Sequence, residues 1–265
     1  MNEQRPGSIF SKTLRAPAIT VSLSALILSA LLGACGGGGG DSTLTTPPAP
    51  VTTNYFPADT AHTWEFEGTI NSIPFVNTLA FTGTTDIQGT TVDVFTESNS
   101  ENKGLTINTF RLLDENGLWY YGTDNSADTL TPLLIPYREM VFPLTPGAGL
   151  VVLAKTGLDY GRDMDGDGIN ETCDVTISTV MDKFENLLLP AGIFTAVAKI
   201  NTYTRIEVTL SKDGTLFVGE EWNSKWYAPD VGPVKRESIF ITDQPGTPVA
   251  SIHVIEELRS YSTLP

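Results

Sequence analysis

Short runs of alternating apolar and polar residues fill the chain from Tyr55 onward, and turn residues separate them. Successive side chains of a β-strand point to opposite faces, so this alternation predicts half-buried strands. Asn116-Gly117 and Asp213-Gly214 stand between such runs, and these dipeptides favour tight hairpin turns because both residues can adopt positive φ. Helical periodicity is nearly absent, and residues 133–142 fit neither pattern. The predicted strands cover residues 62–68, 73–81, 91–97, 105–113, 118–121, 173–181, 185–189, 194–210, 215–226, 234–242 and 249–258.

This pattern predicts an all-β fold with a single antiparallel curved sheet or open half-barrel and strands in meander order. No Pro/Ser-rich break follows residue 52, so we expect one β-rich domain over residues 53–265. A hydrophobic content of 40% in 265 residues is enough for a substantial core. Several strands carry bulky residues on one face and Thr, Asn, Asp and Glu on the other, which predicts one packed and one wet face.

The first 34 residues have the order of a bacterial export signal. Arg5, Lys12 and Arg15 form a positive n-region, and an apolar run over residues 16–32 follows it. An uncleaved transmembrane helix is the weaker interpretation, because the run is short and contains Pro17. We therefore predict a signal peptide over residues 1–34.

The signal closes with Leu32-Gly33-Ala34-Cys35, which resembles a bacterial lipobox. The resemblance implies that the Cys35 sulfur receives a diacylglycerol and that Cys35 becomes the mature N-terminus, with acyl chains that anchor it in a leaflet. Gly36 at the next position implies sorting to the outer membrane. Residues 35–52, rich in Gly and Pro, are expected to act as a tether of about 20–25 Å between the lipidated cysteine and the domain.

Three segments of the domain resemble a group of uncharacterised bacterial lipoproteins. They are an opening Tyr55-Phe56-Pro57 followed by Trp64, a Pro-Ala-Gly-x-Phe turn over residues 190–194, and a Trp-Tyr-Ala-x-x-Val-Gly-x-Val-Lys hairpin over residues 226–235. The resemblance spans residues 55 to about 257 and implies a curved β-sheet or half-barrel, like the shells that carry lipoproteins through the periplasm. It implies no activity, because no function is settled for that family.

The residues of these segments are suited to a structural role. Pro190 and Gly192 can fix a corner between strands, after which Phe194 fills the core. Aromatic side chains mostly bury large areas, which favours core packing for Trp226 and Tyr227. The alternative is a ligand platform formed by these two residues together with Trp222.

Five carboxylates lie within twelve residues of one loop, residues 163–174. Calcium takes six to eight oxygen ligands, which alternate carboxylates and a backbone carbonyl supply well. The pattern resembles the calcium loops of dockerin and thrombospondin type 3 repeats, in which an aspartate closes the loop; Gly168 stands at the sharp turn of position 6. The predicted ligands, at positions 1, 3, 5, 7, 9 and 12, are Asp163, Asp165, Asp167, the carbonyl of Ile169, Glu171 and Asp174.

The alternative for this loop is a solvated acidic turn, in which Asp and Gly serve turn geometry alone. Five like charges at this spacing repel one another without a counterion, so we predict a structural calcium ion. Magnesium fits less well because it demands octahedral geometry and retains its waters. Cys173 lies inside the loop, and it is expected to be a buried inert thiol, with pairing between molecules as the alternative.

No arrangement of residues predicts catalysis. His62 and His253 are the sole histidines, and neither a Gly-x-Ser-x-Gly elbow nor a His-Glu-x-x-His helix occurs. Carboxylates are abundant, but spacing picks out no acid/base pair. We therefore predict no catalytic residues, no enzymatic activity and no bound organic cofactor.

The formal charge of -15 repels nucleic-acid phosphates and attracts divalent cations, so we expect no nucleic-acid partner. The leading hypothesis is a membrane-anchored lipoprotein of the bacterial envelope whose calcium-stabilised β-domain has a structural or interaction role. The alternative is a carrier that holds a hydrophobic or envelope-derived ligand in a half-barrel cavity.

Overall fold

The computed structural model describes residues 54–58, 62–99, 106–125, 128, 130–243 and 250–262. The predicted signal peptide, the lipidated Cys35 and the tether of residues 35–52 lie outside the described residues. Among the described residues, no helix has the length and apolar character needed to span a bilayer.

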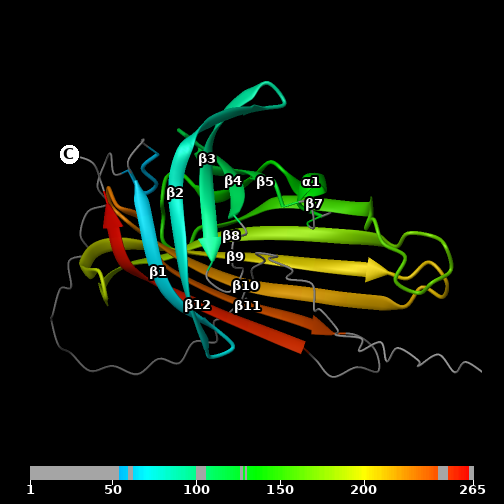
Figure 1. The fold of residues 1–265 in the computed structure, drawn as a ribbon. Helices are drawn as coiled ribbons and strands as arrows, with labels where there is room; N and C mark the ends of the chain where they lie inside the picture. The colour runs from blue at the N-terminus through cyan, green and yellow to red at the C-terminus, as the bar shows by residue number, and fades with distance from the viewer. Residues whose placement is uncertain are drawn as a thin grey trace, which may run out of the picture.

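The described part of the chain forms one antiparallel sheet of twelve strands that is nearly closed into a barrel (Figure 1). The predicted fold class is therefore confirmed. One short helix, α1 (Thr131–Leu134), lies in the segment that fitted neither pattern. The strands are β1 (Thr63–Ile70), β2 (Ile73–Ile87), β3 (Thr90–Asn99), β4 (Thr106–Asp114), β5 (Gly117–Thr123), β6 (Tyr137–Val141), β7 (Gly149–Asp159), β8 (Thr172–Leu189), β9 (Gly192–Thr209), β10 (Leu216–Ala228), β11 (Gly232–Asp243) and β12 (Ala250–Ser262).

Strands that follow one another in the chain are neighbours in the sheet, apart from β6 and β7, which form its two edges. The first and last strands also pair: β1 and β12 align antiparallel, with Thr63 opposite Ser262 and Ile70 opposite Val254. The barrel is therefore open between β6 and β7, which lie in the middle of the sequence. The first and last strands of the chain pair with each other. Asp230 N in the β10–β11 turn donates to Asn54 O (2.8 Å), so residue 54 lies at the same end of the barrel as the end of β12.

Two differences from the predicted strands have local causes. Strand β8 is continuous where two strands were predicted, because register shifts between Met181 and Lys183 and between Glu185 and Leu187 interrupt the alternation. Strand β7 was not predicted; its run Leu150-Val151-Val152-Leu153 does not alternate, and two register shifts interrupt its pairing with β8.

The main apolar core gathers the three segments that resemble the lipoprotein group. Tyr55, Phe56, Trp64, Trp226 and Tyr227 are all buried in one cluster. The indole of Trp64 donates a hydrogen bond to the carbonyl of Val231 (2.6 Å). A Cβ on Gly232, whose φ is +93°, would meet the Trp64 ring at 3.2 Å, so glycine is required at this turn. Packing is thus the use of these aromatic residues, and Trp222 lies against Tyr203 instead of joining them.

The interior also holds charged residues, which the alternation of the strands does not predict. Lys225 of β10 donates to Glu139 of β6 (2.6 Å), which also accepts from Arg111 of β4 (2.8 Å). Strands β6 and β10 are not paired in the sheet, and the three side chains are only 6–15% exposed, so this contact lies inside the barrel.

A second internal group joins β3, β11 and β12. Arg236 of β11 donates hydrogen bonds to Glu97 of β3 (2.7 Å) and to Glu256 of β12, and Asn77 donates to both carboxylates at 2.7 Å. Burial raises the pKa of Glu97, but the charge of Arg236 and these hydrogen bonds outweigh it and lower the pKa to about 2. The interior thus contains buried aromatic rings and ion pairs together.

Candidate metal centre

The acidic loop connects β7 to β8 at the end of the barrel opposite residue 54. Its two ends are joined by backbone hydrogen bonds, from Tyr160 N to Glu171 O and from Glu171 N to Arg162 O, both 2.9 Å. Gly166 and Gly168 adopt φ of +79° and +89°, a region that side chains rarely enter. The glycines therefore let the backbone curl inside this closed loop, as the sequence predicts for position 6.

Three carboxylates of the loop converge. One oxygen each of Asp163, Asp165 and Glu171 lies within 4.8 Å of the other two. Asp163 is exposed and Asp165 half-buried, while Glu171 is 0% exposed. Glu171 therefore forms the buried side of the group, and Asp163 and Asp165 form the side that faces solvent.

Backbone amides hold these carboxylates in place. Glu171 accepts hydrogen bonds from Met164 N (3.0 Å) and from Ser211 N (2.6 Å), one at each oxygen. Asp163 accepts from Gly168 N (2.8 Å) and Gly166 N (2.6 Å), and these donors lower its pKa below the ordinary value for an aspartate. The loop is therefore organised around its carboxylates.

The turn between β9 and β10 contacts the carboxylates of the loop, which no pattern in the sequence predicts. Lys212 N donates to Asp165 (3.1 Å), and the Ser211 hydroxyl donates to Asp167 (2.8 Å). The contact arises because Thr172 at the start of β8 pairs with Thr209 at the end of β9. The pairing of distant strands thus delivers this turn to the loop, and no local motif marks it.

Two other predicted carboxylate ligands, Asp167 and Asp174, are not part of this group of three. Asp167 also accepts a hydrogen bond from Ile169 N (2.8 Å), and the Ile169 side chain is 60% exposed. Asp174 lies within β8, where it accepts a hydrogen bond from Gly157 N (2.8 Å). The geometry therefore selects positions 1, 3 and 9 of the predicted loop, with position 5 turned toward Ser211.

The donor set is chemically suited to a hard cation. Carboxylate oxygens are the ligands that calcium prefers, and each oxygen has a second lone pair after accepting one amide hydrogen bond. Three carboxylates alone fall short of six ligands, so waters or backbone carbonyls would complete the shell. The residues present thus fit calcium bound at the solvent-facing side of the loop.

Cys173 follows this loop directly and packs against the apolar side chains of a second core cluster. It is buried together with Val175 and Val208. Burial, assisted by the negative charges of Asp174 and Asp159, raises the pKa of its thiol to about 11. The expectation of a buried thiol is confirmed, and such a thiol is poorly reactive at neutral pH.

The two histidines have separate structural settings. His62 is buried and stacks on Trp64, with ring centroids 5.6 Å apart. His253 lies on β12, where its Nε2 is 2.9 Å from Glu237. Both histidines are therefore engaged by neighbouring residues of the sheet.

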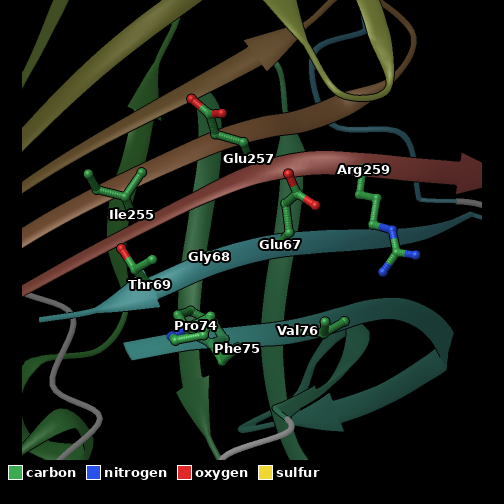
Figure 2. A pocket seen from close by; sticks show the side chains of 9 residues that line it. All are labelled: Glu67, Gly68, Thr69, Pro74, Phe75, Val76, Ile255, Glu257 and Arg259. Atoms are coloured by element: carbon green, nitrogen blue, oxygen red, sulfur yellow. The ribbon is translucent and has the colours of Figure 1, made fainter. Parts of the chain in front are cut away.

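A pocket of about 590 Å³ lies over β1, β2 and β12 and includes none of the acidic-loop residues (Figure 2). Its walls combine the apolar side chains of Phe75, Val76 and Ile255 with charged groups. Glu257 is held by Lys235 at 2.6 Å, and Arg259 lies 3.5 Å from Glu65. The pocket thus has both apolar and charged walls, and two of its charged residues, Glu257 and Arg259, are engaged with neighbouring residues.

Comparisons with known proteins add similar folds without an activity. No protein-family model matches the chain, and no curated protein matches it. A presumed lipoprotein of Parabacteroides distasonis is similar in structure, with 16% identity, a TM-score of 0.39, and coverage of 79% of this chain and 99% of the other. A presumed exported protein with a YmcC-like fold from Bacteroides fragilis has 13% identity, a TM-score of 0.40, and coverage of 80% and 100%. At these scores the similarity carries no argument about function.

Proposed function

We propose that this chain is a non-catalytic lipoprotein of the bacterial envelope, anchored through Cys35 and carrying a β-domain that calcium stabilises. The observation behind the anchor is the order of charge, apolar run and Leu-Gly-Ala-Cys ending in residues 1–35. Gly36 directs the lipoprotein to the outer membrane. The domain serves a structural or interaction role, with residues 36–52 as its spacer.

The observation that carries the calcium proposal is the convergence of Asp163, Asp165 and Glu171 within 4.8 Å. Three carboxylates at this distance repel one another, and a divalent cation offsets that repulsion. The amides that hold them pre-order the loop, so the ion would fasten the β7–β8 connection to the β9–β10 turn. Calcium would therefore act as a structural clamp.

The charged groups inside the barrel favour this function over transport of a hydrophobic ligand. A carrier needs an apolar interior with an opening, whereas Arg111, Glu139 and Lys225 occupy the space between β4, β6 and β10. The pocket over β1, β2 and β12 is lined by charged groups as well as apolar ones. We therefore keep the carrier as the second hypothesis, to be tested by native mass spectrometry of the purified protein for a bound lipid.

Replacing Cys35 with serine is expected to abolish lipidation and leave the precursor uncleaved. The measurement is incorporation of labelled palmitate by the full chain in a bacterial host, with the chain mass read in parallel. Cys173→Ser is the matched control and should retain the label, because Cys173 is buried in the domain. Equal labelling of the Cys35→Ser and native chains would refute anchoring at this residue.

Calcium is expected to bind the mature protein with a dissociation constant of about 0.1–1 mM, as in extracellular modules. At ten times that concentration it should stabilise the fold by about 1.4 kcal/mol. Isothermal calorimetry and the melting temperature measure the two effects, with magnesium as the comparison ion. The Asp165→Asn variant should show neither calcium binding nor stabilisation by calcium.

The variant Asp174→Asn separates the ligand set predicted from the sequence from the set that the geometry brings together. An asparagine oxygen can still accept the hydrogen bond from Gly157, so the fold is preserved. Unchanged calcium binding is expected, because Asp174 lies outside the three converging carboxylates. A native protein that gives no heat and no melting shift with calcium would contradict the clamp.

A further inference from the structure

The hairpin between β8 and β9 carries an exposed apolar tip. Leu188 and Ile193 lie directly opposite each other in the register and are 80% and 76% exposed, the highest values among the exposed large hydrophobic residues. Their neighbours Leu189 and Phe194 point to the core and are buried. Buried Leu189 and Phe194 therefore hold the hairpin against the core. Within the described residues, no side chain covers Leu188 and Ile193.

The chain around the tip is uncharged. No Asp, Glu, Lys or Arg occurs between Glu185 and Lys199, although the protein has a net charge of -15. Tyr261, which is 41% exposed, stands beside the hairpin with its ring 6.1 Å from that of Phe194. Leucine, isoleucine and an adjoining tyrosine are suited to the boundary between headgroups and acyl chains.

The tip lies at the end of the barrel where the N-terminal segment enters the domain. Ala191 N at the turn of the hairpin donates to Leu258 O (2.9 Å), and the Tyr55 hydroxyl donates to Ala196 O (3.1 Å). Figure 1 shows the β8–β9 hairpin and the end of β12 together at the left end of the sheet. The acidic loop is at the far end of β8, which at about 3.3 Å per residue is roughly 55 Å long.

The short segment between Cys35 and the domain limits how far the tip can lie from the membrane. Fewer than twenty residues separate Cys35 from Asn54. A Gly-rich chain of that length has an end-to-end distance of about 20–25 Å, which keeps the near end of the domain at the surface that holds the lipid. The anchor therefore presents the tip to the leaflet at a high effective concentration.

We propose that the β8–β9 hairpin tip, Leu188 and Ile193, inserts into the leaflet that holds the acyl chains of Cys35. This inference rests on the proposed anchoring. The tip makes a second contact with the membrane, which orients the barrel with its acidic loop away from the lipid. Calcium in the surrounding solution then has direct access to that loop.

The test places a fluorescent label at the tip of the full-length lipidated protein. Ile193→Cys is labelled with nitrobenzoxadiazole, because Cys35 is blocked by lipid and Cys173 is buried with a raised pKa. Ile169→Cys, an exposed isoleucine in the acidic loop, is the matched control. Both proteins are reconstituted into vesicles of phosphatidylethanolamine and phosphatidylglycerol that contain doxyl-labelled phosphatidylcholine.

Doxyl lipid is expected to quench the label at residue 193 and leave the label at residue 169 unchanged. Adding Leu188→Asp to the first variant should abolish the quenching, since a charge opposes insertion, while the protein still floats with the vesicles. Flotation without quenching at residue 193 overturns the tip contact and leaves the anchor standing. A blue shift without quenching also overturns it, because protein then covers the tip. Loss of flotation in the native chain overturns both proposals.

Discussion

Replacing Glu139 with glutamine is expected to lower the free energy of unfolding by about 3–5 kcal/mol, the usual cost of removing one partner from a buried ion pair. Glu139 is buried between Arg111 and Lys225 and accepts a hydrogen bond from each. Its neutral replacement leaves two cations facing each other inside the barrel. Denaturant unfolding of the mature protein measures the change.

The matched control is Glu207→Gln. Glu207 pairs with Arg205 at 2.6 Å, but both side chains are more than one third exposed. Such a surface pair contributes at most about 1 kcal/mol, so its loss should have little effect. Similar changes at the two positions would show that the internal charges do not hold the barrel together.

The pH dependence of the Glu139 effect follows from the direction of its pKa shift. Burial raises the pKa, but Arg111 and Lys225 outweigh it and lower the pKa from 4.5 to about 2. A depressed pKa means that the stabilisation is complete above pH 4.5 and is lost as the pH falls toward 2. The difference between the native protein and Glu139→Gln should therefore shrink over that window.

Replacing Glu221 with glutamine is expected to have the opposite sign and to stabilise the protein at neutral pH. Glu221 is 1% exposed, and its Oε2 has no hydrogen-bond partner within the described structure. Burial raises its pKa well above 4.5, although the charge of Lys225 opposes this. Lys225 is itself held by Glu139, so it does not pair with Glu221.

A raised pKa means that the folded chain keeps a proton that the unfolded chain releases. The native protein therefore loses stability as the pH rises above 4.5, by about 1.4 kcal/mol for each pH unit over which the folded state retains that proton. Glutamine is neutral at every pH and removes this loss. Unfolding curves at several pH values measure it.

Glu115→Gln serves as the control for this prediction, because Glu115 is exposed in the turn between β4 and β5. It should leave both the stability and its pH dependence nearly unchanged. A Glu221→Gln variant that is less stable than the native protein at neutral pH would show that the buried carboxylate is ionised and paired.

The fold class could be predicted because alternation is a local property of the strands. In β9 the residues Ile200, Ile206 and Val208 are buried, and polar residues occur between them, as the sequence pattern indicates. The same rule fails where the backbone departs from regular pleating, at the shifts of β8 and β7. No local pattern could show that β1 pairs with β12.

The candidate site could be predicted in part. Asp163 and Asp165 follow from the loop pattern, and Glu171 follows from its position 9. Its burial and the contacts of Ser211 and Lys212 depend on the pairing of β8 with β9. The internal ion pairs were missed because the charge on Glu139 looks the same in the sequence whether a strand faces water or the inside of a barrel.

The pairing of β1 with β12 has a consequence for when the sheet can be completed during folding. Thr63 pairs with Ser262, 199 positions later in the chain. Strand β1 is therefore made first but can pair with β12 only after the last strand has been made. A long closure of this kind is slow and costly in chain entropy. During synthesis from the N-terminus, the sheet therefore cannot be completed until the final strand has been made. A chain that ends before Ala250 would lack β12 and leave the edges of β1 and β11 unpaired. Only a chain that includes β12 can therefore complete the sheet.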